Sequence, residues 1–181
     1  MTKNNLLAML ATHTPHDPHE REMCARIARF VADHDDCFER SLLIGHVTGS
    51  AWVLDTSHTH TLLTHHRKLD KWLQLGGHAD GEPDVLRVAL REAMEESGLT
   101  GIRPASESIF DVDIHLIPAR GGEPGHFHYD VRFLFTAGRG EPLKLSNESK
   151  ALAWVELGRV DQLTQEESML RMVRKTQDLP P

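Results

Sequence analysis

The chain contains few residues that could crosslink it or anchor it in a membrane. Its 181 residues include two cysteines, Cys24 and Cys37, too few for a disulfide framework or a cysteine-rich metal site. No apolar run approaches the ~20 residues of a membrane-spanning helix, and the first residues lack a signal-peptide pattern. These absences predict a single globular domain in the reducing cytoplasm.

Positive charge is also scarce. Twenty Lys and Arg residues stand against 27 Asp and Glu, which gives a formal net charge of −7. Non-specific binding to nucleic acid depends on phosphate neutralisation by Lys and Arg, so long nucleic acid is not expected as a partner. A small phosphorylated substrate remains compatible, because a bound cation can reverse the local sign of the charge.

The chain does have a concentrated acidic ridge near its middle. Glu92, Glu95 and Glu96 are spaced i, i+3 and i+4, so they share one face of a helix expected over residues 83–97. Gly98 is well placed to end this helix in a left-handed conformation. The three like charges repel one another, but a divalent cation between them makes the arrangement favourable, and Mg²⁺ prefers oxygen ligands.

The residues 77–99 resemble the Nudix box, GX5EX7REUXEEXGU, in which U is aliphatic. The matching positions are Gly77, Arg91, Glu92, Ala93, Glu95, Glu96, Gly98 and Leu99. Pro83, which by itself fits the first turn of the expected helix, stands where the pattern has its first Glu. In the family that Glu helps to orient the Arg and the Glu after it. Three neighbouring carboxylates could replace it here: Asp80, Glu82 and Asp84.

The resemblance implies an α+β fold, the Nudix-type α/β/α sandwich of a mixed sheet and helices. It also implies a metal-dependent pyrophosphohydrolase, which cleaves a nucleoside diphosphate linked to another group X. By resemblance, Mg²⁺ or Mn²⁺ binds to Glu92, Glu95, Glu96 and the backbone carbonyl of Gly76. Arg91 is expected to orient Glu92 through a charge-assisted hydrogen bond.

The general base is less closely specified, because in this family it is either a box glutamate or a carboxylate on a distant loop. Glu148, in the loop before the strand that contains Trp154, is the favoured loop residue. Glu123, in the loop of residues 118–125, is the second choice.

Histidines are unusually numerous, with 13 in the chain. His126, His128 and Asp130 alternate along an expected strand, so their side chains should share a face, and His78 and His115 are expected near the same region. We expect His126 or His128 to contact substrate. A second metal site for Mn²⁺, Fe²⁺ or Zn²⁺ is the alternative use of these imidazoles.

Two arginines outside the box are candidates for phosphate binding. Arg67 and Arg132 could each bind a phosphate bidentately. Arg67 is the stronger candidate for a substrate-binding residue.

Residues 1–45 are predicted to form an N-terminal helical extension packed on the domain, and residues 46–178 the Nudix hydrolase domain. The extension could also mediate a homodimer. Expected helices cover 22–34 and 165–175, besides the box helix, and expected strands cover 51–54, 61–64, 72–75, 109–117, 129–136 and 151–155.

Two other functions remain open at this point. A catalytically silent Nudix-fold module that binds a nucleotide and regulates another process would explain the loss of a box residue at Pro83. An enzyme similar to isopentenyl-diphosphate isomerase, which uses a His-rich metal site, would need an active-site cysteine. Neither Cys24 nor Cys37 lies in a matching strand, so this function is the least favoured.

Overall fold

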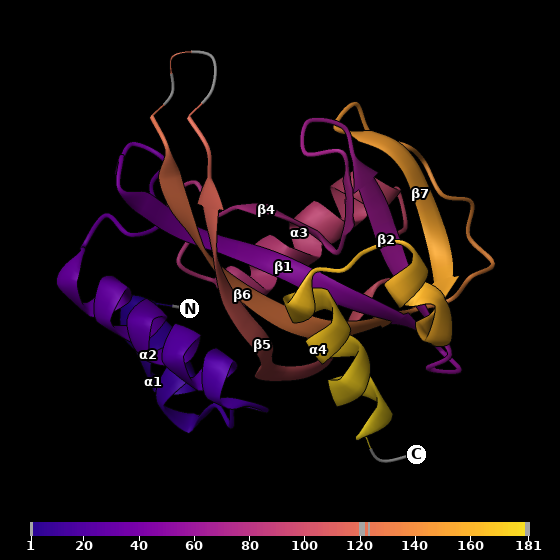
Figure 1. Cartoon of the computed structure of the whole chain (residues 1–181), viewed down its shortest axis with the longest axis horizontal. Coiled ribbons are helices and arrows are strands. Elements are labelled where there is room, and N and C mark those ends of the chain that lie inside the picture. Colours follow the sequence, from indigo (N-terminus) through magenta and orange to yellow (C-terminus); the bar gives the residue numbers. More distant parts are fainter. Residues whose placement is uncertain (1, 120–121, 123, 180–181) are drawn as a thin grey trace.

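The computed structural model describes residues 2–119, 122 and 124–179. Seven strands form one mixed sheet in the order β3-β2-β1-β6-β5, with β4 also paired to β1 and β7 to β2 (Figure 1). Their bounds are β1 Gly45–Asp55, β2 His60–His66, β3 Lys71–Leu73, β4 Leu75–His78, β5 Arg103–Ile117, β6 His126–Ala137 and β7 Ser149–Glu156. Within this part of the chain, no helix has the length and apolarity needed to cross a membrane.

Helices cover both faces of the sheet. Their bounds are α1 Lys3–Thr12, α2 Pro18–Asp33, α3 Val85–Ser97, α4 Glu167–Gln177 and a 3-10 helix at Leu157–Gln162. On β1, Gly49 faces α3, where a Cβ atom would come within 2.8 Å of the Val85 carbonyl oxygen. Trp52 faces the opposite way and its indole N–H donates to Thr176 Oγ1 on α4, at 2.9 Å. The predicted α+β sandwich is therefore confirmed (Figure 1).

The central strand β1 differs from its prediction. It begins at Gly45 rather than near Ser50, because it pairs in parallel with β6 from Gly45 opposite Phe127 to Asp55 opposite Ala137. Local alternation of side chains does not reveal this long-range pairing.

The strand expected over residues 72–75 is also different. It divides into β3 and β4, and β4 carries the paired glycines Gly76 and Gly77. It pairs antiparallel with β1, with Gly77 opposite Gly49.

The two N-terminal helices pack beside β5 and are tied to the rest of the protein by buried charges (Figure 1). Phe30 on α2 stacks on Tyr129 of β6, with ring centroids 3.7 Å apart. Glu20, fully buried on α2, accepts hydrogen bonds from Lys175 Nζ at 2.7 Å and from the His16 amide at 2.6 Å. An ion pair thus joins the first helices to α4.

Arg171 extends this network into the sheet. Its guanidinium donates two hydrogen bonds to Asp111 of β5, at 2.8 and 2.9 Å, and Arg132 of β6 donates to the same carboxylate at 3.1 Å. All three side chains are buried. Buried charges are tolerated only when paired and hydrogen-bonded, so this network fixes how α4 sits against β5 and β6.

Replacing Glu20 by Gln should lower stability and change its pH dependence. Burial alone would raise the pKa of Glu20, but hydrogen bonds from His13, Lys175 and the His16 amide outweigh it and hold the pKa at about 2, against 4.5 in an unfolded chain. The ionised carboxylate therefore contributes stability above pH 4.5, and this contribution is lost as the pH falls towards 2.

The measurement is the free energy of unfolding in urea at several pH values. At pH 7, Glu20→Gln should cost roughly 3 kcal/mol, because Lys175 loses a buried partner. It should also flatten the acid side of the stability curve. The exposed Glu22→Gln on the same helix is the control and should change stability by less than ~0.5 kcal/mol. Equal losses in the two variants would contradict the prediction.

Candidate functional site

The helix α3 begins and ends where its sequence provides caps. Asp84 Oδ1 accepts a hydrogen bond from the Arg87 amide at 3.1 Å, so Asp84 is the N-cap. Pro83 therefore precedes the helix rather than occupying its first turn, which corrects the expected start. At the other end Gly98 adopts the predicted left-handed conformation, with φ of 70°, and its amide bonds the Met94 carbonyl.

Glu96 lies buried at the centre of the acidic ridge. The backbone N–H of Gly76 on β4 donates to Glu96 Oε2 at 3.0 Å, and Glu96 is 7% exposed. Burial raises the pKa of Glu96 to about 7, aided by the negative charges of Glu92 and Glu148 and opposed by the Gly76 hydrogen bond. The carboxyl of Glu96 therefore loses its proton less readily than an exposed glutamate, and a nearby positive charge would favour its ionised form.

Gly77 lets the carboxylate of Glu92 approach the sheet. A Cβ atom at Gly77 would lie 2.3 Å from Glu92 Oε2, so any side chain there would displace the carboxylate. Burial also raises the pKa of Glu92, although Arg91 counteracts this. Glu95, the third member of the ridge, is exposed. The close packing of β4 on α3 is therefore the reason for a glycine at the first box position.

Arg91 contacts two carboxylates of the ridge and one backbone carbonyl of β4. Its Nη1 lies 2.5 Å from Glu92 Oε1 and 3.6 Å from Glu95 Oε2, and its Nη2 donates to the His78 carbonyl oxygen at 3.0 Å. Arg91 thus spans from α3 to β4 and can orient Glu92, as the box resemblance implies.

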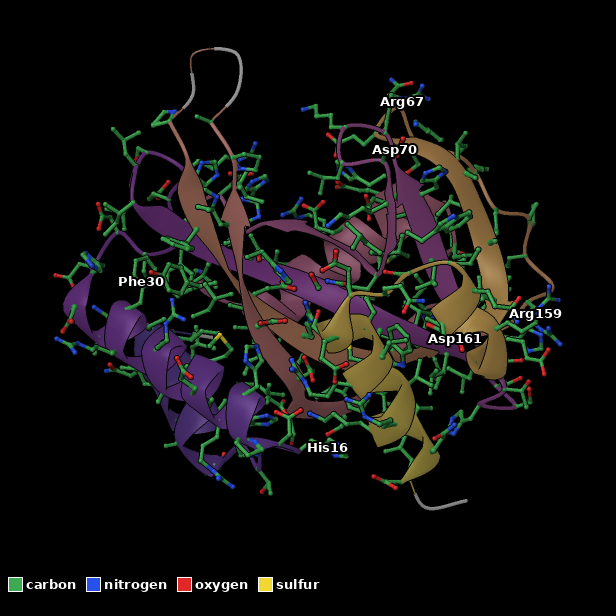
Figure 2. The ribbon with its side chains drawn as sticks, viewed as in Figure 1. His16, Phe30, Arg67, Asp70, Arg159 and Asp161 are labelled. Atoms are coloured by element: carbon green, nitrogen blue, oxygen red, sulfur yellow. The ribbon has the colours of Figure 1, made fainter. Side chains whose placement is uncertain are left out.

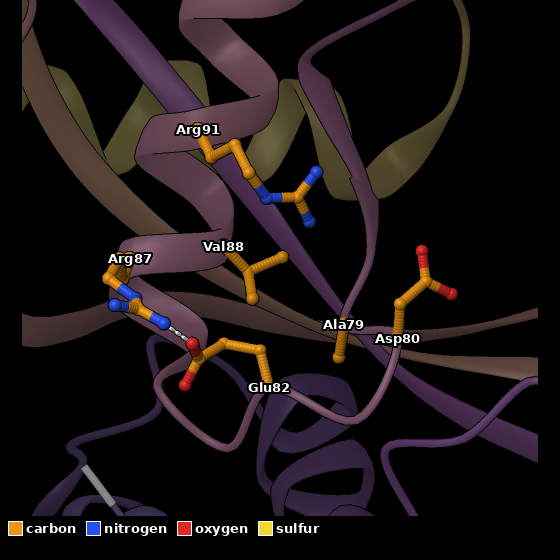
Figure 3. A pocket seen from close by; sticks show the side chains of 6 residues that line it. All are labelled: Ala79, Asp80, Glu82, Arg87, Val88 and Arg91. Atoms are coloured by element: carbon orange, nitrogen blue, oxygen red, sulfur yellow. Dashed lines mark ion pairs between the residues drawn. The ribbon is translucent and has the colours of Figure 1, made fainter.

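Two of the carboxylates considered as replacements for the box Glu, namely Glu82 and Asp80, pair with other arginines. Glu82 forms an ion pair with Arg87 (Figure 3). Asp80 pairs with Arg40, whose Nη2 donates to Asp80 Oδ2 at 2.6 Å. In this structure the backbone carbonyl of His78 is a further partner of Arg91, supplied by the strand itself.

An open pocket of about 490 Å³ lies between the loop after β4 and the first turns of α3. Figure 3 shows the guanidinium of Arg91 extending towards this loop, while the Arg87 side chain turns to Glu82. The other lining residues are Ala79, Asp80 and Val88. The pocket places a cationic side chain beside the acidic ridge, as a site for a phosphorylated group requires.

The donor set of the ridge fits a hard divalent cation. Glu92 and Glu96 bring two partly desolvated carboxylates together, and their mutual repulsion is part of why the pKa of Glu96 rises. Oxygen ligands of this kind suit Mg²⁺ and Mn²⁺. A cation here would favour the ionised form of both side chains.

Glu148 lies in the short segment just before β7. Its side chain is exposed, and its negative charge contributes to the raised pKa values of Glu92 and Glu96. The structure therefore brings Glu148 into the electrostatic surroundings of the ridge, although 52 positions separate it from Glu96. Glu123, the other loop residue, lies outside the described residues.

Arg67 holds the same segment in place. Its Nε donates to the Asn147 carbonyl at 3.0 Å and its Nη2 to the Ser149 carbonyl at 2.8 Å. Figure 2 shows Arg67 at the end of the sheet beside β7, near Asp70. It thus supports the backbone on both sides of Glu148.

Arg132, named with Arg67 as a candidate for phosphate binding, is buried in the structure. It is 1% exposed and is bonded to Asp130 at 2.8 Å, to Asp111 and to His115 Nε2 at 2.7 Å. Its guanidinium is buried and bonded to Asp130, Asp111 and His115, so it is not exposed to bind phosphate.

His126 and His128 lie on β6 with their side chains on the sheet face opposite α3, where they meet His46 and His78. Ring centroids in this group are about 5 Å apart, and His126 Nε2 lies 3.3 Å from His128 Nε2. Burial, together with the neighbouring positive charges, lowers the pKa of His46 to about 4 and that of His128 to about 2. Desolvation therefore favours the neutral form of His46 and of His128.

His46 is the member of this group that the sequence did not single out. The sequence feature that could have revealed it is the alternation of polar residues at the start of β1. His46, Thr48 and Ser50 fall on one face of that strand. The parallel register then places His46 directly opposite His128.

A comparison with protein-family models shows the family to which the chain belongs. The NUDIX domain family model matches residues 46–176, more than half of the chain. The chain belongs to the Nudix family. By this membership it is a Nudix hydrolase. No curated protein matches the sequence itself.

Solved Nudix structures share the fold at low sequence identity. An Ap4A hydrolase from C. elegans is 18% identical with a TM-score of 0.59, covering 72% of this chain and 94% of its own. The E. coli dihydroneopterin triphosphate pyrophosphohydrolase is 14% identical with a TM-score of 0.55, covering 71% and 92%. RenU, a Nudix hydrolase from M. smegmatis, is 18% identical with a TM-score of 0.55, covering 76% and 89%.

The close approach of Gly77 and Glu92 allows a test of whether the acidic ridge binds a divalent cation. Gly77→Ala should weaken Mn²⁺ binding by about tenfold or more, since Glu92 must swing away from the new methyl group. The melting temperature should fall by less than ~4 °C, because the displaced atoms are at the flexible end of a side chain. Isothermal titration with Mn²⁺ and thermal unfolding measure the two effects.

Gly138→Ala is the matched control, because a Cβ there would meet no atom within 4 Å. It should leave Mn²⁺ affinity unchanged. If Gly77→Ala binds Mn²⁺ as tightly as the control does, Glu92 is not positioned by this contact.

Proposed function

We propose that this protein is a metal-dependent pyrophosphohydrolase that cleaves a nucleoside diphosphate linked to another group X. The observation that carries the proposal is the packing of Gly76 and Gly77 on Glu96 and Glu92, with Arg91 bridging α3 and β4. This arrangement gathers carboxylates and a guanidinium beside an open pocket. Such a combination suits hydrolysis of a phosphoanhydride.

Glu92, Glu95, Glu96 and the Gly76 carbonyl would hold Mg²⁺ or Mn²⁺. When bound, such an ion lowers the pKa of water and neutralises phosphate oxygens. Arg91 orients Glu92 by its 2.5 Å contact. Glu148 is the proposed general base, its carboxylate taking the proton of the attacking water, and Arg67 positions it by holding the backbone on both sides.

The substrate is proposed to be a small nucleotide derivative. Named structural neighbours include hydrolases of Ap4A and of dihydroneopterin triphosphate, and a NUDIX domain of NrtR from Shewanella oneidensis complexed with ADP ribose. A chain of linked phosphates is common to these compounds. Arg67, His126 and His128 are the proposed substrate contacts outside the box. The net charge of −7 favours a small ligand over a long polyanion.

A panel of nucleotide derivatives, incubated with Mg²⁺ or Mn²⁺, tests the activity directly. ADP-ribose, a nucleoside triphosphate, a dinucleoside polyphosphate and a nucleotide sugar should be included, and products identified by chromatography. We expect release of a nucleoside monophosphate or of a phosphate product from at least one of them. Tight nucleotide binding without turnover of any compound would instead support the regulatory module.

Glu96→Gln should reduce turnover more than ~100-fold, since it removes a charge from the metal ligands. The fold should be retained or slightly stabilised, because burial already disfavours the ionised form of Glu96. Steady-state kinetics and thermal unfolding separate these effects. Glu107→Gln, at an exposed position of β5, is the control and should behave like the wild type. Turnover of Glu96→Gln within a few-fold of that control would overturn the ligand assignment.

A further inference from the structure

A second group of metal-ligating side chains lies on the face of the sheet opposite α3. His46, His78 and His128 each offer a ring nitrogen, and these nitrogens all lie within 4.8 Å of one another. The ring centroids are separated by 5.1 Å between His46 and His78 and by 4.9 Å in the other two pairs. The group is distinct from the carboxylates of the ridge, which project from α3.

Three hydrogen-bonded strands hold the three rings. His46 on β1 is directly opposite His128 on β6 in the parallel register. His78 on β4 is opposite Thr48, two residues along β1 from His46, so its side chain falls on the same face. The convergence is therefore set by backbone pairing rather than by flexible loops, as a preorganised site requires.

His46 carries the observation that points to a ligand. Its side chain is 3% exposed, and neither Nδ1 nor Nε2 has a hydrogen-bond partner among the described residues. Leaving a buried polar group without a hydrogen-bond partner is unfavourable. A bond from one ring nitrogen of His46 to a metal ion would give that nitrogen a partner.

The neighbouring carboxylate is already fully engaged. Asp130 accepts hydrogen bonds from Thr48 at 2.9 Å, Ser50 at 2.7 Å, Gln74 at 3.1 Å and Arg132 at 2.8 Å. It is thus occupied in the polar network rather than directed at the imidazoles. The available donors are nitrogens, which favour late first-row transition metals over Mg²⁺.

We propose that His46, His78 and His128 form a second metal site that binds Zn²⁺ or a similar late first-row divalent cation. Metal–nitrogen bonds of about 2.1 Å in tetrahedral geometry place the ligand atoms about 3.4 Å apart, so modest ring rotations close the site. Three protein ligands leave one coordination position open. His126 lies close to these three ligands, with its Nε2 3.3 Å from His128 Nε2.

Co²⁺ binding to the full chain tests the site, because tetrahedral Co²⁺ absorbs strongly in the visible range. The protein is stripped with a chelator and titrated with Co²⁺ in excess Mg²⁺, which competes for the carboxylates. We expect one equivalent of Co²⁺ with intense d–d bands, displaced by one equivalent of Zn²⁺. Absence of such bands would overturn the proposal.

Variants assign the ligands. His46→Gln and His128→Gln should each weaken Co²⁺ binding at least tenfold, whereas His19→Gln, on the exposed face of α2, should bind like the wild type. Glu96→Gln should also retain the Co²⁺ bands, which separates this site from the ridge. Persistence of the bands in both ligand variants would overturn the assignment.

X-ray absorption of the Zn²⁺-loaded wild type gives an answer even if a variant does not fold. The spectrum should show nitrogen neighbours at about 2.0–2.1 Å with the multiple scattering of three imidazoles. A shell of oxygen neighbours without imidazole scattering would contradict the proposal. None of these measurements depends on hydrolase activity, so failure of the proposed function would leave this result standing.

Discussion

The pairing of β1 with β6 is the constraint on which the positions of the acidic ridge and of the histidine group depend. It runs in parallel along the whole of β1, from Gly45 to Asp55, and buries every residue of that strand. Alternate residues then serve opposite faces. Gly49 permits α3 to pack closely, while His46, Thr48 and Ser50 line the other face. The ridge and the histidines are positioned by a single strand.

The electrostatics of the two faces differ in kind. On the α3 side, Glu92 and Glu96 are acidic groups whose charge is disfavoured by burial and repulsion. On the other side, desolvation favours the neutral forms of His46 and His128. Hard oxygen donors and neutral nitrogen donors select different cations. The fold thus places the ridge carboxylates and the imidazoles on opposite faces of one sheet.

Features encoded locally could be predicted from the sequence. The box helix follows from its apolar stripe and its glycine stop, and the ridge of Glu92, Glu95 and Glu96 from helical spacing. The sequence does not decide the start of this helix, because both Pro83 and Asp84 suit a first turn. The hydrogen bond that Asp84 accepts from the Arg87 amide makes Asp84 the N-cap. Roles assigned to individual site residues remain predictions.

Features that depend on distant pairing could not be predicted in the same way. The burial of Arg132 follows from Asp111 and Arg171, which other elements contribute. His46 gains its neighbours only through the parallel register with β6. The alternation of polar residues along β1 indicates that His46 lies on a polar face. It does not indicate which strand pairs with β1, because the strand order depends on distant parts of the chain.

The short strand β4 contacts both the acidic ridge and the histidine group. Gly76 packs on Ser50 and bonds Glu96, Gly77 packs on Glu92, and His78 offers its carbonyl to Arg91 while its ring joins the histidines. Each of these residues is thus engaged with a different neighbour. Because one short strand contacts both groups, a substitution that moves β4 would alter the surroundings of Glu92, Glu96 and the His78 ring together.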